Sequence, residues 1–340
     1  MLPYDDISCY VLLTKALSQS RYFQKVFSRF GKIVMRVLLT GGTGMVGRNI
    51  KEHKNACNYS VLAPSRKELD LTNRDQIRSY LKATTPEYII HAAGLVGGIH
   101  ANIANPSRFL IENLEIGCNL ISEAASMGVK NIINLGSSCM YPKNGPNPLK
   151  EEYLLNGLLE PTNEGYAIAK IAAQRLCDYL RIEDNSRNYI TLMPCNLYGK
   201  YDNYNPKRSH LIASIIVKIN KAKVNSEKTV EIWGDGSVRR EFMYVKDFAE
   251  AVWFSLPRIK EIPHIINVGR GEDYSIYDYY KKISQILGFK GSFTFNLGKP
   301  TGMKQKLLDV KKINDLGWFP RHDLALGIKK TYSQYLECHR

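Results

Sequence analysis

The sequence of 340 residues lacks two features: a hydrophobic run near the ~18–20 residues needed to cross a bilayer, and any Cys-x-x-Cys pair or ligand-spaced cysteine cluster. It therefore offers no membrane span and no zinc site, and we expect no bound metal. Its seven cysteines are scattered, which also argues against a secreted disulfide framework. These absences predict a soluble protein of a reducing compartment, which we take to be the cytoplasm.

Acidic side chains are also few, with 32 Asp and Glu against 47 Lys and Arg, giving a formal charge of +15. Such a surplus bears on solubility and on anionic partners but not on fold. Nucleic acid, a membrane surface and a phosphorylated small molecule are all candidates. Because the lysines are dispersed rather than clustered, a solvated basic surface is the favoured explanation.

Residues 1–34 differ from the rest of the chain. Asp5 and Asp6 stand at the start and the apolar stretch is short and interrupted, so the layout of a signal peptide is missing. We interpret this segment as an extension outside the folded core or as the consequence of a true start at Met35. A membrane anchor formed by an amphipathic helix is the weaker alternative.

From residue 35 to about 196, short apolar runs alternate with helical patterns, which lie for example at 105–127 and 165–181. Repeated βα units of this length imply a parallel sheet covered on both faces. The sequence therefore predicts an α/β fold with a doubly wound, Rossmann-like sheet. Its candidate strands are 35–40, 60–63, 88–92, 131–136 and 189–194.

After Asn196 the alternation of apolar runs and helical patterns stops, and a polar stretch rich in Asn and Tyr follows. We expect residues 35–196 to form a dinucleotide-binding domain, to which the chain returns around 240–260. The segments 197–239 and 261–340 are expected to form a smaller C-terminal α/β lobe that binds substrate.

A glycine-rich turn, G-x-x-G-x-x-G, follows the first strand directly and opens a helix. Glycines there permit a tight turn and let backbone N–H groups approach a pyrophosphate. The strand before and the helix after the motif favour a dinucleotide site over an ordinary βα turn. The residues expected to contact the cofactor are Gly41, Thr43, Gly44, Met45, Val46 and Gly47.

The end of the second strand bears on the choice between NAD and NADP. An acid there would hold the ribose 2′-OH of NAD, whereas an arginine accommodates the 2′-phosphate of NADP. The segment reads Ala63-Pro64-Ser65-Arg66-Lys67, with no acid before Glu68. NADP is therefore favoured through Arg66, and a solvated arginine is the alternative. Asp70 and Leu71 are expected near the adenine.

Tyr166 and Lys170 stand four residues apart, on one face of a predicted helix. A nearby ammonium favours the phenolate form, so we expect Lys170 to lower the pKa of Tyr166 and make it usable in acid–base chemistry. Ser137 follows a predicted strand and could donate a hydrogen bond to a carbonyl oxygen. A Tyr-x-x-x-Lys pair alone is usually structural, but its combination with Ser137 and the glycine turn is specific.

Further stretches bring the chain into resemblance with a known family. They are Val96-Gly97-Gly98-Ile99, Gly136-Ser137-Ser138-Cys139-Met140-Tyr141-Pro142, Leu159-Glu160-Pro161-Thr162-Asn163-Glu164, Tyr166-Ala167-Ile168-Ala169-Lys170, Pro194-Cys195-Asn196-Leu197-Tyr198-Gly199, Ser209-His210, Trp233-Gly234-Asp235-Gly236, Arg240-Glu241-Phe242 and Lys306-Leu307-Leu308-Asp309. From about residue 35 onward the chain resembles the GDP-L-fucose synthase family of extended short-chain dehydrogenases/reductases. Members of that family epimerise C3 and C5 of GDP-4-keto-6-deoxymannose and then reduce C4.

The resemblance implies roles for individual residues. Ser137, Tyr166 and Lys170 would form the reduction triad, while Cys139 and His210 would be the acid–base pair for epimerisation. A ketone at C4 acidifies the hydrogens on both neighbouring carbons, which agrees with this division. Contacts to NADP(H) are expected from Ala92, Tyr166, Lys170, Pro194, Asn196, Leu197 and His210, and contacts to the GDP-sugar from Lys218, Trp233, Arg240 and Lys306.

The partners implied are a GDP-4-keto-deoxy sugar and a second copy of the chain, with no nucleic acid and no membrane. Four positions depart from the family pattern: Thr43 lies in a glycine turn without a basic residue, Lys218 replaces an Arg, Thr301 an Asp, and Leu95 a Lys. The exact hexose is therefore open. The alternative is C4 reduction, with or without epimerisation, of another GDP-4-keto sugar such as a 6-deoxyheptose or colitose precursor.

A second alternative is a protein that keeps the dinucleotide fold without catalysis and senses redox state or binds nucleic acid. The basic charge suggests it. The presence of Ser137, Tyr166 and Lys170 argues against it.

Overall fold

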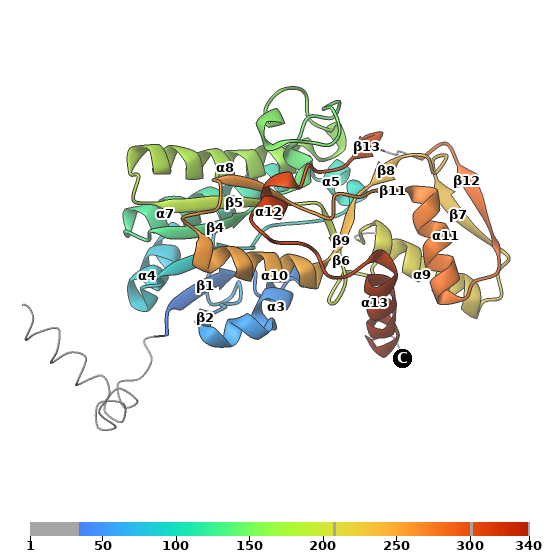
Figure 1. Cartoon of the computed structure of the whole chain (residues 1–340), viewed down its shortest axis with the longest axis horizontal. Helices are drawn as coiled ribbons and strands as arrows, with labels where there is room; N and C mark the ends of the chain where they lie inside the picture. The colour runs from blue at the N-terminus through green and yellow to red at the C-terminus, as the bar shows by residue number, and fades with distance from the viewer. Residues whose placement is uncertain (1–33, 207–208, 300–301, 339–340) are drawn as a thin grey trace, which may run out of the picture. The chain divides into compact units, whose positions relative to one another are not determined.

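The computed structural model describes residues 34–206, 209–299 and 302–338. The extension predicted at 1–34 therefore lies, except for Val34, outside the described residues, as does Thr301. Six parallel strands form the central sheet (Figure 1). Across the sheet their order is β10 (Ile265–Val268), β5 (Asn188–Pro194), β4 (Asn131–Leu135), β3 (Tyr88–His91), β1 (Arg36–Thr40) and β2 (Ser60–Leu62).

Helices cover both faces of this sheet. Successive side chains of a strand point to opposite faces, so one strand contributes residues to two different apolar clusters. In β1, Val37 and Leu39 join one apolar cluster and Leu38 joins another. The first cluster takes in α3 (Met45–Lys51), α10 (Val245–Ser255) and α12 (Lys311–Asp315), and the second takes in α4 (Arg74–Thr84), α7 (Leu120–Ser126) and α8 (Glu164–Glu183). The predicted doubly wound α/β fold is confirmed.

The predicted elements of this part lie where the periodicity put them. The five candidate strands match β1 to β5 to within one residue at each end. The helix expected at 105–127 is α6 (Pro106–Leu114) followed by one π-helical turn (Glu115–Asn119) and α7, and the helix expected at 165–181 is α8. Helix α6 packs along α8.

A smaller lobe has its own apolar core, built on aromatic and isoleucine side chains. Its helices are α9 (Leu211–Val224), α11 (Ile276–Leu287) and α13 (Leu324–Cys338). Its short sheets pair β7 (Thr229–Trp233) with β12 (Ser292–Asn296) and β6 (Asn196–Tyr198) with β9 (Phe242–Tyr244). In a third sheet, β8 (Arg239–Arg240) lies between β11 (Tyr274–Ser275) and β13 (Gln305–Lys306).

One predicted assignment differs from the structure. Residues 261–340 were expected in the smaller lobe, yet β10 pairs with β5 in the central sheet and Ile313 of α12 belongs to the core beneath it. All four residues of β10 are buried, which requires covered faces that the large sheet provides. Helix α10 also packs on the large domain, where Trp253 donates to the Ile50 carbonyl at 2.8 Å.

Among the described residues, no helix combines the length and the apolar character that crossing a membrane would take.

Candidate active site

The predicted site residues meet around one pocket at the carboxyl ends of the central strands, where parallel α/β sheets bind their ligands. Gly41 follows β1, Ala92 follows β3, Ser137 follows β4, and Pro194 ends β5. The other predicted residues that line the same pocket are Thr43, Gly44, Met45, Val46, Gly47, Arg66, Asp70, Leu71, Cys139, Tyr166, Lys170, Asn196, Leu197, His210, Lys218, Trp233, Arg240 and Lys306.

The glycine turn is too crowded for larger residues at two positions. Gly41 has φ +70°, and a Cβ there would lie 2.6 Å from the Ala92 carbonyl oxygen. A Cβ on Gly47 would lie 2.1 Å from the carbonyl oxygen of Gly41, so this glycine lets α3 start close against β1. Gly44 precedes α3 without a side chain to cap it. The turn therefore leaves backbone open toward the pocket, as a dinucleotide pyrophosphate requires.

Arg66 lines the pocket and has a partner that the sequence did not indicate. Its Nη1 atom is 2.8 Å from Oε1 of Glu112 on α6, and its Nε atom is 3.9 Å from Oδ1 of Asp70. Glu112 also accepts from Arg108 Nε at 3.1 Å. The hydrogen bond to Glu112 raises the pKa of Arg66. Glu112 lines the pocket as well, so two carboxylates flank the arginine predicted to select NADP.

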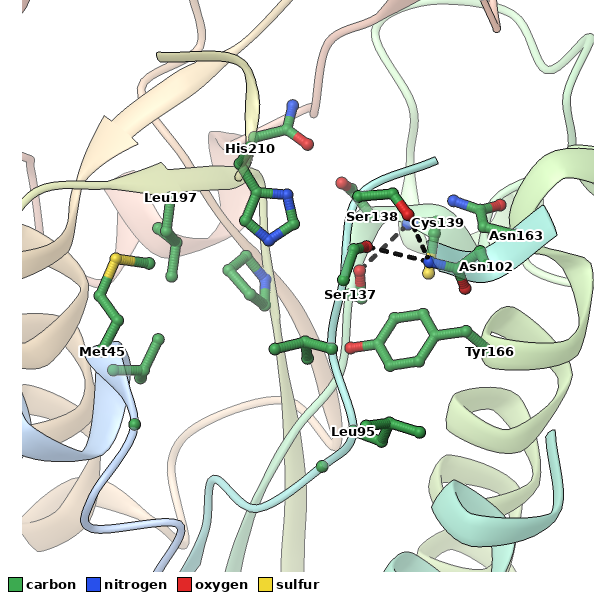
Figure 2. A pocket seen from close by; sticks show the side chains of 18 of the residues that line it. Met45, Leu95, Asn102, Ser137, Ser138, Cys139, Asn163, Tyr166, Leu197 and His210 are labelled. Carbon is green, nitrogen blue, oxygen red and sulfur yellow. Dashed lines mark hydrogen bonds between the residues drawn. The ribbon is translucent and has the colours of Figure 1, made fainter. Parts of the chain in front are cut away.

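Ser137, Tyr166 and Lys170 come together although they belong to different elements. Ser137 precedes a short 3-10 helix (Ser138–Met140), and its Oγ atom accepts the N–H of Cys139 at 3.3 Å. Tyr166 and Lys170 extend from α8, and Figure 2 shows the Tyr166 hydroxyl pointing into the pocket. Lys170 Nζ donates to the Leu135 carbonyl at 2.8 Å and lies 6.0 Å from the centre of the Tyr166 ring.

The expected lowering of the Tyr166 pKa by Lys170 is wrong for this structure. Burial raises the pKa of Tyr166, and a hydrogen bond with Ser137 opposes that rise only in part. Burial also lowers the pKa of Lys170 from 10.5 to about 8. The cause is desolvation, which disfavours the charged form of both groups, while the ammonium is directed to a backbone carbonyl. The phenol of Tyr166 therefore keeps its proton at neutral pH.

Cys139 and His210 lie on opposite sides of the pocket (Figure 2). Burial raises the pKa of the Cys139 thiol, against the opposing effects of Ser137, Lys306 and Lys170. Burial lowers the pKa of His210, and the charge of Lys306 lowers it further. At neutral pH this makes the thiol a proton donor and the neutral imidazole a proton acceptor.

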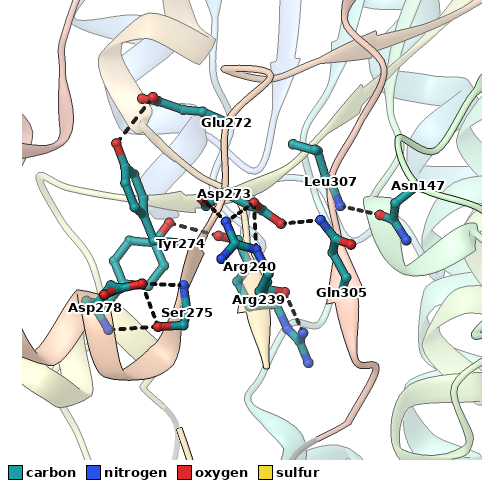
Figure 3. Close-up of polar contacts among 11 residues, drawn as sticks. Asn147, Arg239, Arg240, Glu272, Asp273, Tyr274, Ser275, Asp278, Gln305 and Leu307 are labelled. Carbon is teal, nitrogen blue, oxygen red and sulfur yellow. Dashed lines mark hydrogen bonds and ion pairs between the residues drawn. The ribbon is translucent and has the colours of Figure 1, made fainter. Parts of the chain in front are cut away.

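Two cations stand side by side on neighbouring strands, because Arg240 of β8 pairs in register with Lys306 of β13. Asp273 ties these strands together, accepting from Arg239 Nη2 at 2.7 Å and from Gln305 Nε2 at 2.8 Å (Figure 3). Arg240 Nη1 donates to the Met303 carbonyl at 2.6 Å. The Met303 carbonyl therefore orients Arg240 at the pocket, and Lys306 lines the same pocket from the neighbouring strand.

Lys218 and Trp233 line the part of the pocket that the smaller lobe contributes. Lys218 Nζ donates to the Glu231 carbonyl at 3.0 Å and lies 5.2 Å from the centre of the Trp233 ring. Lys299 Nζ lies 5.5 Å from the same ring. The site thus presents an aromatic face and positive charge to a ligand that reaches it.

Sequence reasoning gave no role to several polar residues of the pocket, among them Glu112, Asn102 and Asn163. Asn163 stands in a stretch that carried the family resemblance, and this could have drawn attention to it. Glu112 lies 46 residues from Arg66, and no local pattern connects the two.

A glycine turn, a Tyr-x-x-x-Lys helix and a strand-end serine around one pocket define a Rossmann-type enzyme of the short-chain dehydrogenase/reductase class. The chain belongs to the NAD dependent epimerase/dehydratase family, whose model matches residues 37–269.

Several proteins of stated activity are similar to the chain over most of its length. The GDP-L-colitose synthase of Yersinia pseudotuberculosis is 49% identical over 302 residues, covering 89% of this chain and 98% of that protein. The GDP-L-fucose synthase of Azorhizobium caulinodans is 44% identical over 301 residues, covering 88% and 96%. Among solved structures, the NADP-bound GDP-mannoheptose C4 reductase MlghC of Campylobacter jejuni has a TM-score of 0.81 at 32% identity, covering 90% of this chain and 99% of that chain.

Proposed function

We propose that the chain is an NADPH-dependent 3,5-epimerase and 4-reductase that converts GDP-4-keto-6-deoxymannose to GDP-L-fucose. The observation that carries this proposal is a single pocket in which Ser137, Tyr166 and Lys170 lie together with Cys139 and His210. The GDP-L-fucose synthase that is 44% identical to the chain supports the same reaction.

NADP(H) is the cofactor we assign. The glycine turn fits its pyrophosphate, since crowding around Gly41 and Gly47 leaves only backbone at the pocket wall. We assign the 2′-phosphate to Arg66, which lines the pocket, and the NADP bound to the related MlghC supports the choice of cofactor. When bound, NADPH supplies the hydride that reduces C4.

Epimerisation needs one group that removes a proton and another that returns one from the opposite face of the ring. His210 is suited to removal, because burial keeps its imidazole neutral. Cys139 is suited to return, because burial keeps its thiol protonated and Figure 2 shows it across the pocket from His210. The C4 ketone acidifies the hydrogens at C3 and C5, so one pair of residues can serve both carbons, provided that proton exchange with solvent restores the imidazole and the thiol between the two steps.

Reduction needs a proton at the C4 oxygen. Tyr166 supplies it as a phenol whose raised pKa keeps the acid form. The Ser137 hydroxyl donates a hydrogen bond to the same oxygen, and Lys170 provides positive charge beneath the tyrosine. Tyr166 is then reprotonated from solvent before the next turnover.

The nucleotide part of the substrate is assigned to the cations of the smaller lobe. Arg240 and Lys306 are proposed to bind the diphosphate, and an arginine fork suits phosphate oxygens. Trp233 is proposed to meet the guanine, with Lys218 beside it.

A second candidate is C4 reduction, with or without epimerisation, of another GDP-4-keto sugar. The specific observation in its favour is the 49% identity to a GDP-L-colitose synthase. The similarity of the heptose reductase MlghC points in the same direction.

The deciding experiment incubates the purified protein and NADPH with GDP-4-keto-6-deoxymannose, GDP-4-keto-3,6-dideoxymannose and a GDP-4-keto-6-deoxyheptose in separate reactions. Mass spectrometry and NMR identify each product. We expect GDP-L-fucose from the first substrate at the highest kcat/KM. A higher kcat/KM with either other sugar would transfer the proposal to the second candidate.

We further propose a cytoplasmic homodimer. The cysteines of the described residues are free thiols, which supports a reducing compartment. Helices α6 and α8 leave Ile111 and Ile168 exposed at 55% and 42%, and a second copy of the same helices would bury them.

A further inference from the structure

Two buried carboxamide oxygens in the pocket have no hydrogen-bond partner among the described residues. They are Oδ1 of Asn102 and Oδ1 of Asn163. Both residues line the pocket, and Figure 2 shows them on the side of Cys139, across from His210. Buried polar atoms are nearly always hydrogen-bonded in folded proteins, so two such acceptors in one pocket indicate a ligand that donates to them.

The orientation of the Asn102 carboxamide is fixed by the backbone. Asn102 lies on α5 (Ile99–Ala104) and is only 6% exposed. Its Nδ2 atom donates to the carbonyl oxygens of Gly97 at 2.9 Å and of Gly98 at 3.1 Å. A flipped carboxamide would turn its oxygen toward these two carbonyls, which cannot donate. Oδ1 of Asn102 is therefore an acceptor in need of a donor.

Asn163 lies at the N-cap position of α8, where an asparagine side chain ordinarily accepts a backbone N–H of the first helical turn. Here the side chain makes no capping hydrogen bond. Asn163 instead lines the pocket, three residues before Tyr166. The oxygen of Asn163 therefore does not cap α8, although an asparagine at this position can do so.

The chemistry of the two acceptors identifies the part of the ligand that meets them. A phosphate has no proton to donate at neutral pH, which excludes the diphosphate and the 2′-phosphate. The guanine is assigned to Trp233, on the part of the pocket that the smaller lobe contributes. Hydroxyls of a hexose are neutral donors, as are ribose hydroxyls and the nicotinamide amide. Of these groups the hexose is the one whose proposed chemistry needs Cys139, and both asparagines lie on the side of Cys139.

We propose that Asn102 and Asn163 accept hydrogen bonds from hydroxyls of the hexosyl group and so hold the sugar ring against Cys139. This inference rests on the proposed function, since it takes the ligand to be a GDP-hexose. It assigns sugar recognition to two neutral side chains. Asn163 gives the cleaner test, because the Asn102 amide also holds the backbone of its loop.

The test measures dissociation constants of GDP-L-fucose, GDP and NADP⁺ by calorimetry for the wild type and Asn163→Ala. We expect Asn163→Ala to bind GDP-L-fucose about 10-fold more weakly, the size expected for one lost hydrogen bond. Binding of GDP and NADP⁺ should stay the same, and so should Tm, because no cap is lost. Asn163→Asp keeps an acceptor and should restore most of the affinity for GDP-L-fucose.

Asn314→Ala is the matched control, because Asn314 also has a buried oxygen without a partner but does not line the pocket. It should leave all three dissociation constants unchanged. Unchanged binding of GDP-L-fucose by Asn163→Ala, or equal weakening of GDP and NADP⁺, would overturn the inference. A wild type that binds GDP-L-fucose no more tightly than GDP would overturn it as well. The proposed function is judged separately, by whether the wild type makes GDP-L-fucose.

Discussion

Arg66 and Glu112 are joined by a hydrogen-bonded ion pair of 2.8 Å between elements 46 residues apart. Glu112 extends from α6, so the pair ties the loop after β2 to that helix. The side chain of Arg66 remains 64% exposed, which leaves it accessible to a ligand. Glu112 therefore positions the guanidinium, and it would compete for that charge with the 2′-phosphate that we assign to Arg66.

Arg66→Ala should change the preference between the two nicotinamide cofactors. A hydrogen bond to a charged group contributes about 1.5–3 kcal/mol, so we expect binding of NADPH to weaken about 10- to 100-fold. NADH lacks the 2′-phosphate and should bind as before. Fluorescence titration of both cofactors measures the ratio.

Arg108→Ala is the control for this experiment. Arg108 also pairs with Glu112, through its Nε atom at 3.1 Å, but does not line the pocket. It should change neither affinity by more than about 2-fold, in the range of surface ion pairs. If Arg66→Ala lost affinity for NADH and NADPH equally, the result would show that Arg66 stabilises the local structure of the pocket and does not bind the phosphate.

Cys139→Ser should separate epimerisation from reduction. A serine hydroxyl is a far weaker acid than the thiol, so proton return to the ring should slow by about 10²–10⁴-fold, the usual contribution of a positioned acid or base. Incubation of the keto sugar in D₂O without NADPH, followed by NMR of C3 and C5, measures both the inversion and the deuterium incorporated with it.

Cys177→Ala serves as the matched control, since Cys177 is equally buried but belongs to the core on the other face of the sheet. It should exchange deuterium as the wild type does. If the wild type itself shows no exchange, the enzyme reduces C4 without epimerising, and the second candidate function applies.

Much of the fold follows from local pattern. Strand and helix periods in residues 35–196 depend on neighbours only a few positions apart, so the sequence alone placed β1 to β5 and α8. The glycine turn and the Tyr166–Lys170 spacing are local in the same sense. The presence of these motifs along one sheet edge then predicts a shared pocket, as the structure has it.

Long-range features could not be predicted in this way. Strand β10 pairs with β5, which lies about 70 residues earlier in the chain, and the four residues of β10 carry no local signal for that pairing. The pairing of Arg66 with Glu112 has the same character. The pKa of Tyr166 depends on how deeply the pocket buries the phenol, which spacing along a helix does not give.

Ile168→Glu should abolish the proposed homodimer. Ile168 lies on α8 beside α6 and is 42% exposed, and a glutamate there would place two uncompensated charges in a symmetric interface. Sedimentation equilibrium should show a dimer for the wild type and a monomer for the variant. Val224→Glu, at a 75% exposed position at the end of α9, should remain dimeric. A wild type that sediments as a monomer would refute the dimer outright.

The burial of Lys170 predicts a pH-dependent stability. Its pKa is near 10.5 in the unfolded chain and about 8 in the folded protein, because burial disfavours the ammonium. Between pH ~8 and pH ~10.5 the unfolded state binds more protons than the folded state. The loss of folding stability caused by the buried ammonium is therefore complete below pH ~8 and is relieved as the pH rises toward ~10.5. Lys170→Met removes the buried charge and should be free of this effect. Urea unfolding should show the wild type gaining about 3 kcal/mol relative to the variant across that range, at about 1.4 kcal/mol for each pH unit. A constant difference between the two proteins from pH 7 to 10.5 would mean that Lys170 keeps an ordinary pKa in the fold.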